Sequence, residues 1–127
     1  MSIFLPNTEQ VIELHRRIVT CTGGSAELRS QALLESALAR GQAGFDGHEL
    51  YPSVEEKAAA IGCGLIQNHA FVDGNKRIGV MVMLLILRMN HLPIQYEQTE
   101  LIEIGLSTAS GTTDVINMVH WIREHKA

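Results

Sequence analysis

The chain of 127 residues is long enough for one domain with a core of its own and too short for two. Hydrophobic residues make up 46% of the sequence and charged residues 19%, a composition typical of folded globular proteins and not of disordered ones. The formal net charge of -4, without any run rich in lysine or arginine, argues against a dedicated nucleic-acid binder.

The N-terminus and the apolar segments favour a cytoplasmic protein. The N-terminus has no cationic start followed by an apolar stretch, so we expect no signal peptide. The longest apolar run, residues 78–87, has about half the roughly 20 residues of a membrane span and predicts a buried core helix. Cys21 and Cys63 form no CxxC pair, which predicts reduced thiols. Together these features predict a cytoplasmic protein without a membrane segment.

The first part of the chain predicts two helices and a flap. Asn7 and Gln10 have the spacing of a capping box, and apolar residues then recur at helical spacing until Gly23. A second helix is expected over about residues 27–40. The segment GQAGFDGHELYP, residues 41–52, contains three glycines and a proline, so it predicts a loop or short hairpin.

The second part of the chain predicts four more helices. Ser53 and Glu56 form a second capping box, which opens a helix that runs towards Asn68. Further helices are expected over about residues 75–90, 99–110 and 113–125, the last of them capped by a threonine. No sustained alternating pattern competes with them. The sequence thus predicts an all-α bundle of about six helices, forming a single domain over residues 1–127.

The sequence HAFVDGNKR, residues 69–77, places polar residues between the third and fourth helices. Both helices are apolar nearly all round and should lie at the centre of the bundle. Phe71 is expected to anchor the connection in the core. Asp73, Gly74 and Asn75 are typical of a turn, in which Gly74 can adopt positive φ. Backbone N–H groups of such a turn before a helix form an anion-binding nest.

The charged residues of this stretch favour a phosphate site. Lys76 and Arg77 open a helix whose dipole they oppose, and a bound polyphosphate would offset that cost. Asp73 could hold a Mg²⁺ that bridges phosphate oxygens. His69, at the end of the preceding helix, could act as a general base. A helix cap, an ordinary turn and a solvated pair of cations would explain each part singly, but their combination predicts a reactive site.

The remaining histidines show no metal-ligand spacing with a supporting cluster of Cys, Asp or Glu. We expect them to be structural or surface residues: His15, His48, His91, His120 and His125.

The stretch resembles the signature of the Fic/Doc family: histidine, any residue, phenylalanine, any residue, aspartate, a small residue, asparagine, lysine or glycine, and arginine. The Gly-rich segment, the Tyr51-Pro52 pair before the third helix and the short C-terminal helices look like the death-on-curing (Doc) toxin branch. Ala70 stands where many Fic proteins have proline. The resemblance implies a Fic/Doc-like helical bundle with a flap.

The resemblance also implies an activity. Fic enzymes transfer a nucleotidyl group, usually AMP from ATP, to a protein hydroxyl and have glycine at the position of Lys76. Doc-type proteins resemble them but bind the nucleotide in the reverse direction and transfer its γ-phosphate. The implied function is phosphoryl transfer from ATP, with Mg²⁺, to a Ser/Thr hydroxyl of a translation factor such as elongation factor Tu. The outcome would be growth arrest.

Carried over by resemblance, His69 would be the base, and Asp73 would hold Mg²⁺ and help to position the attack. Gly74 and Asn75 would supply the nest, and two cations, Lys76 and Arg77, would bind phosphates. A flap would dock the target backbone by strand addition. Its residues are Gln42, Ala43, Gly44, Phe45, Asp46, Gly47, His48, Glu49 and Leu50.

Regulation is also implied by the resemblance. Many Fic proteins carry a self-inhibitory helix in which Gly or Asn follows a glutamate, and no glutamate here is followed by either residue. We therefore expect a small antitoxin that inhibits in trans, through a helical tail in a groove of the bundle.

Two alternatives to the kinase function stay open: an AMP transferase of Fic type, and a catalytically idle module that binds a phosphate or a partner.

Overall fold

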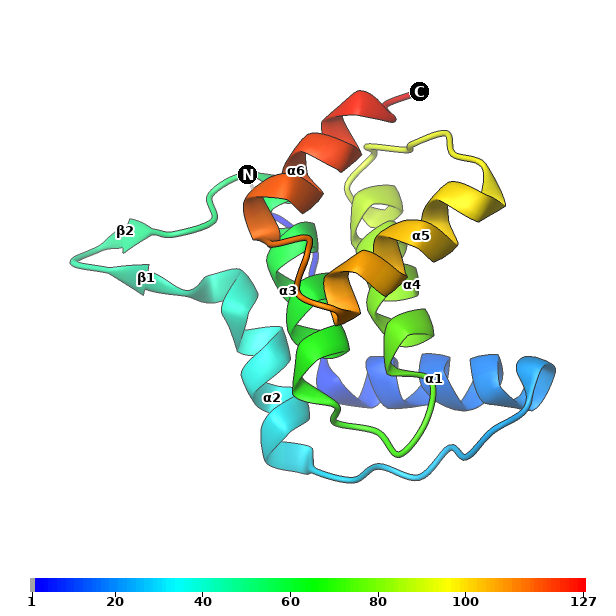
Figure 1. The fold of residues 1–127 in the computed structure, drawn as a ribbon. Coiled ribbons are helices and arrows are strands. Elements are labelled where there is room, and N and C mark those ends of the chain that lie inside the picture. The colour runs from blue at the N-terminus through cyan, green and yellow to red at the C-terminus, as the bar shows by residue number, and fades with distance from the viewer. Residues whose placement is uncertain (1) are drawn as a thin grey trace.

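The computed structural model describes residues 2–127 and confirms an all-α fold with one small hairpin. The helices are arranged around a central pair, and the hairpin projects from one side (Figure 1). In chain order the elements are α1 (Thr8–Thr22), α2 (Gln31–Ala39), the 3-10 turn η1 (Arg40–Gln42), β1 (Gly44–Phe45), β2 (His48–Glu49), α3 (Val54–Asn68), α4 (Asn75–Met89), α5 (Gln98–Ala109) and α6 (Val115–Glu124).

The two capping boxes set the starts of α1 and α3 as predicted. Asn7 Oδ1 accepts the Gln10 N–H at 2.8 Å, and Gln10 Oε1 accepts the Asn7 N–H at 2.9 Å. Ser53 and Glu56 make the same reciprocal pair, with both distances 3.1 Å. Each box satisfies backbone donors that a helix start would otherwise leave unpaired, so these boundaries are fixed locally.

Two predicted helix starts are wrong. α2 begins at Gln31 because Ser30 caps it through the Leu33 N–H at 3.1 Å, while residues 27–30 lie outside the helix. α6 is capped by Asp114, which accepts the Asn117 N–H at 2.8 Å. A threonine does not cap it, because the Thr113 hydroxyl lies 2.7 Å from that of Ser107 and hydrogen-bonds there.

α3 and α4 form the centre of the bundle, as their apolar sequences predict. α2 and α6 pack on α3, α5 packs on both central helices, and α1 crosses near the start of α4 (Figure 1). The central pair approaches closely at two glycines. A methyl group on Gly79 would lie 2.8 Å from the carbonyl oxygen of Gly62, so a side chain there would push the helices apart. The loop between α3 and α4 is thereby carried by the most tightly packed part of the molecule.

The expected flap is a short antiparallel hairpin. β1 and β2 pair Gly44 with Glu49 and Phe45 with His48. Asp46 and Gly47 form the turn, with φ of 50° and 76°, both in the left-handed region. The Phe45 ring is 80% exposed. The hairpin stands clear of the helices in Figure 1, and the residues of both strands are exposed.

Buried Lys57 of α3 holds the base of the hairpin. Its Nζ donates to the Gly41 carbonyl and to Glu49 Oε1, both at 2.7 Å. The lysine is only 4% exposed, so this charge depends on its two partners for compensation. The flap is therefore tied to α3 at its β2 end.

Both cysteines are free, Cys21 exposed and Cys63 buried. Burial raises the pKa of the Cys63 thiol to about 11, which keeps it in the unreactive thiol form. Within residues 2–127, none of the helices combines the length and apolarity that crossing a bilayer requires.

Candidate active site

His69 ends α3 in a left-handed conformation, with φ 52° and ψ 50°. This conformation is uncommon for a residue other than glycine and turns the chain sharply out of the helix. The Arg29 side chain stabilises the turn, because its Nε donates to the His69 carbonyl at 2.8 Å and its terminal nitrogen donates to the Asn68 carbonyl at 3.3 Å. The His69 side chain itself is exposed, as a base that must reach an external substrate requires.

An extended segment before α2 braces the loop after His69. The Arg29 and Ser30 N–H groups donate to the Ala70 carbonyl at 2.7 and 3.0 Å, and the Val72 N–H donates to the Glu27 carbonyl at 3.0 Å. Leu28 and Phe71 form an antiparallel bridge. This pairing is the physical reason why residues 27–30 are not helical: their backbone groups bind the loop instead of one another.

Phe71 fixes the loop from inside. Its side chain is 1% exposed and belongs to the hydrophobic core. The ring stacks on the buried His15 of α1, with ring centroids 3.7 Å apart and planes 14° apart. The Phe71 backbone is held as well, because the Asn75 side chain accepts its N–H at 3.1 Å and donates to its carbonyl at 2.9 Å. The Asn75 amide thus points inward, and any contribution to an anion nest comes from its backbone.

Asp73 presents an exposed carboxylate at the turn. Its Oδ2 accepts the Ser25 N–H at 3.2 Å, and its backbone carbonyl lies 2.7 Å from His15 Nε2. Gly74 follows with φ 77°, the left-handed conformation expected for it. No group of three or more His, Cys, Asp or Glu residues within residues 2–127 could hold a metal by itself. A single carboxylate does suit Mg²⁺ that takes its remaining ligands from water and substrate phosphates.

The start of α4 carries two exposed cations. Gly74 is its N-cap and provides no side-chain cap, so the first-turn N–H groups keep their capacity for an anion. Lys76 and Arg77 follow directly, and the Arg77 guanidinium donates to the Thr22 hydroxyl at the end of α1. The structure therefore gathers the exposed His69 and Asp73, the uncapped helix start and both cations on one loop and helix turn.

A groove of about 520 Å³ extends from these cations between α1, α4 and α5. Lys76, Arg77 and Arg17 lie along it, together with a lining that is mainly apolar: Ile18, Cys21, Val80, Met81, Leu101, Ile102 and Leu106. Ile102 and Leu106 are each 53% exposed, although both are large apolar residues. The groove thus joins an apolar floor to a cationic end.

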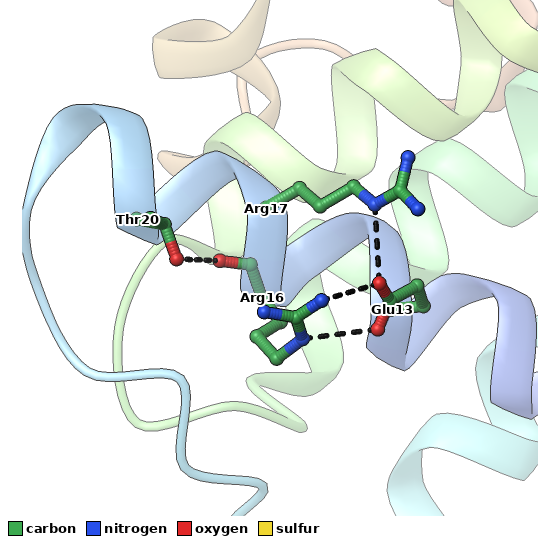
Figure 2. A network of polar contacts seen from close by, with 4 residues as sticks. All are labelled: Glu13, Arg16, Arg17 and Thr20. Atoms are coloured by element: carbon green, nitrogen blue, oxygen red, sulfur yellow. Dashed lines mark hydrogen bonds and ion pairs between the residues drawn. The ribbon is translucent and has the colours of Figure 1, made fainter.

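Arg17 is held in place by a polar network on α1. Glu13 accepts from Arg17 Nε at 3.1 Å and from Arg16 Nε at 3.0 Å, and the Thr20 hydroxyl donates to the Arg16 carbonyl at 2.8 Å (Figure 2). Hydrogen bonds from the two arginines lower the pKa of the Glu13 carboxyl to about 2. Glu13 therefore stays ionised, and it restricts the Arg17 side chain beside the groove.

The sequence did not place three residues at this site: Ser25 and Arg29 were not singled out, and His15 was expected only to be a structural or surface residue. One signal was present. His15 lies four residues after Val11 and four before Val19, so the histidine occupies the buried stripe of α1. A polar residue in such a stripe requires a partner, and here that partner is the Asp73 carbonyl. The contacts of Ser25 and Arg29 join residues far apart in the sequence and left no local pattern.

The comparison with protein families agrees with this geometry. The family model described as Fic/DOC family matches residues 5–87, which include α1, the flap, the loop and most of α4. The chain belongs to the Fic/Doc family. The predicted resemblance is thereby confirmed for the part of the chain that carries the motif.

The chain is also similar to a curated relative, Toxin Doc of Mycolicibacterium smegmatis (strain ATCC 700084 / mc(2)155). The two are 49% identical over 55 residues, which is 43% of this chain and 42% of the relative. The match therefore spans less than half the length of that relative.

Proposed function

We propose that this member of the Fic/Doc family is a Doc-type toxin that transfers the γ-phosphoryl group of ATP to a Ser/Thr hydroxyl of a target protein. The observation that carries the proposal is the arrangement of exposed His69 and Asp73 next to the uncapped start of α4, with Lys76 and Arg77 in its first turn. A base, a carboxylate and an anion site in one turn are the parts that phosphoryl transfer needs. The name of the Mycolicibacterium relative, Toxin Doc, supports the toxin role.

In the proposed reaction the target hydroxyl attacks the γ-phosphorus of ATP. A new oxygen–phosphorus bond forms, the bond from the γ-phosphorus to the β–γ bridging oxygen breaks, and ADP leaves. His69 takes the proton of the hydroxyl, a role that its exposure permits. Lys76, Arg77 and the first N–H groups of α4 bind the phosphate oxygens and offset the charge of the transition state.

Asp73 is the residue that would hold Mg²⁺. When bound, the ion would supply positive charge to the phosphate oxygens and orient them. The Ser25 N–H on Oδ2 restricts the Asp73 side chain and leaves its other oxygen for the ion. The carboxylate thus provides the fixed part of a metal site that the nucleotide completes.

Lys76 is the residue that leads us to propose a kinase activity and not an AMP transferase activity. Its side chain stands in the first turn of α4, where a glycine would leave room for part of a triphosphate. With the lysine present, we infer that the triphosphate enters in reverse and places its γ-phosphate at the nest. The alternative, AMP transfer, requires the α-phosphate at the same point.

The target is proposed to be a translation factor, such as elongation factor Tu, docked on the flap. The hairpin is exposed, two-stranded and held by Lys57, so a target segment could add to it as a further strand. Two large apolar side chains, Phe45 at 80% and Leu50 at 61% exposure, would contact that segment. The hairpin is tied to Lys57 near the start of α3, whereas His69 follows the end of that helix, so a docked target segment would have to extend along α3 to bring a hydroxyl to His69.

Inhibition in trans is proposed to use the groove between α1, α4 and α5. An amphipathic helix of an antitoxin, apolar on one side and acidic on the other, would match its floor and the cations Arg17, Lys76 and Arg77. Because two of these cations are the proposed phosphate ligands, the same helix would block the nucleotide. A short reading frame found upstream of the gene would be the candidate antitoxin.

Growth measurements test the proposed function. Induced expression of the parent in a bacterial host should arrest growth and protein synthesis, and His69→Ala should not. Co-expression of a short reading frame found upstream of the gene should restore growth to the parent but not to a Leu106→Glu variant, which places a charge in the groove. Ile116→Glu is the matched control, because Ile116 is 68% exposed on α6 and lies outside the groove. Growth unaffected by the parent would contradict the toxin role.

A further inference from the structure

His15 of α1 is completely buried, with an exposed fraction of 0%, and it contacts the loop that carries His69 and Asp73. Its Nε2 lies 2.7 Å from the backbone carbonyl oxygen of Asp73. A carbonyl oxygen can only accept, so the hydrogen of this bond must reside on Nε2. The bond joins two residues that are 58 positions apart in the sequence, and it anchors the loop to a helix that carries none of the motif.

The same imidazole contacts the residues on both sides of Asp73. It stacks on Phe71 with centroids 3.7 Å apart. It also lies under Gly74, where an added methyl group would be 3.2 Å from Nε2. His15 therefore touches three positions of the turn, and it holds the backbone on which the Asp73 carboxylate and the start of α4 depend.

If His15 served only to fill space in the core, its imidazole would be an unfavourable choice. Its Nδ1 is buried and has no hydrogen-bond partner within residues 2–127. A buried polar atom without a partner is unfavourable, and a methionine or leucine would fill a similar volume without that cost. The directed hydrogen bond to Asp73 is the interaction that only the histidine provides.

We propose that His15 is a positioning residue, which fixes the Asp73 carbonyl and hence the orientation of the Asp73 carboxylate and of the Gly74 turn. The proposal rests on the proposed function for its catalytic consequence. The positioning itself is a property of the fold and can be tested in the absence of any reaction. His15 is not a catalytic residue, because the side chain is buried beneath the loop and reaches no substrate.

The tautomer of His15 is the first test and requires no variant. Nitrogen NMR shifts of the parent should show the hydrogen on Nε2 and a bare Nδ1. A hydrogen on Nδ1, with Nε2 bare, would overturn the proposal, because the bond to the Asp73 carbonyl could not form.

A pair of variants separates positioning from packing. His15→Gln retains a donor that can reach the Asp73 carbonyl, and His15→Met retains volume without a donor. We expect amide exchange at Asp73, Gly74 and Asn75 to be faster in His15→Met than in the parent, and near the parent rate in His15→Gln. The melting temperatures of the two variants should be similar, since each loses the same ring from the core.

The catalytic consequence is measured as the split between kcat and KM. His15→Met should lower kcat for γ-phosphoryl transfer by about tenfold, equivalent to about 1.4 kcal/mol, with a smaller change in KM for ATP. His15→Gln should keep most of the kcat of the parent. Equal kcat in the parent and His15→Met, or equal loss in both variants, would overturn the proposal. A parent that transfers no phosphoryl group would contradict the proposed function alone, and amide exchange would then decide on the positioning.

Discussion

The side chain of Asn75 forms two hydrogen bonds with the backbone of Phe71, accepting its N–H at 3.1 Å and donating to its carbonyl at 2.9 Å. A residue in the first turn of α4 thereby holds the loop four positions before it. The amide suits this task because it carries one acceptor and one donor group at the right separation. The turn containing Asp73 and Gly74 is enclosed between the two ends of this clamp.

The first prediction concerns the Asn75 clamp. Asn75→Asp retains the acceptor for the Phe71 N–H but places a carboxylate oxygen against the Phe71 carbonyl. Because Asn75 is 8% exposed, we expect a loss of about 1–3 kcal/mol in the free energy of unfolding, the usual cost of an unsatisfied buried group. Chemical denaturation measures it. Asn117→Asp makes the same change at an exposed position of α6 and should leave stability nearly unchanged; equal effects of the two variants would contradict the clamp.

The second prediction concerns Phe71 itself. Phe71→Ala removes a ring that is 1% exposed and stacked on His15, so the free energy of unfolding should fall by about 3–5 kcal/mol. Thermal and urea unfolding provide the measurement. Phe45→Ala removes the same ring from the exposed flap and serves as the control. If both variants melt at the temperature of the parent, the Phe71 ring does not anchor the loop.

The sequence predicted the parts of this fold that depend on local chemistry. The starts of α1 and α3 follow from capping boxes, in which residues three positions apart satisfy each other, and the burial of α3 and α4 follows from their apolar composition. The hairpin was one of the two forms expected for residues 41–52. Gly74 adopts the positive φ that its place in the turn predicted.

The error over residues 27–30 and the omissions at the site have one physical origin, which is pairing between distant segments. Leu28 fits a helical pattern, yet it forms a bridge with Phe71, and Arg29 binds the end of α3. These tertiary hydrogen bonds override the local preference for helix over residues 27–30. The contact of His15 with Asp73 and the groove between α1, α4 and α5 likewise depend on how helices pack, which a single sequence does not encode in any local pattern.

The third prediction concerns the dependence of stability on pH. The Glu100 carboxylate accepts from His125 Nε2 at 2.9 Å, and with the Trp121 carbonyl at Nδ1 it raises the pKa of His125 above its ordinary value. The same bond lowers the pKa of Glu100. The His125 contribution is therefore fully present below the ordinary histidine pKa and is lost as pH rises through the raised value. The Glu100 contribution is present above the ordinary glutamate pKa and is lost on acidification.

Urea unfolding at about pH 6 and about pH 8, on either side of the ordinary histidine pKa, measures this effect. The parent should lose more stability than His125→Gln between the two conditions. An identical pH dependence of parent and variant would show that His125 does not gain from Glu100 in the folded state.

The fourth prediction concerns the direction in which ATP binds. Lys76→Gly should weaken γ-phosphoryl transfer, because a charge-assisted contact worth about 1.5–3 kcal/mol is lost. It should also open space for the triphosphate, so that some α-label from ATP reaches protein. Lys76→Met is the matched control, since it removes the charge and keeps the length, and it should lose γ-transfer without gaining α-transfer. Full γ-transfer by Lys76→Gly, with no α-transfer, would mean that Lys76 does not set the orientation.

Phosphoryl transfer from ATP by the His69 loop is tested most directly by incubating the purified chain with Mg²⁺, elongation factor Tu and ATP labelled on either its γ- or its α-phosphate. His69→Ala is the control, and it should fold like the parent because the side chain is exposed. General base catalysis contributes about 10²–10⁴-fold to such rates, so the variant should be nearly inactive. We expect γ-label on the target, no α-label, and neither label with His69→Ala. Transfer of α-label by the parent would instead identify an AMP transferase, and γ-label undiminished by His69→Ala would contradict the role of this loop.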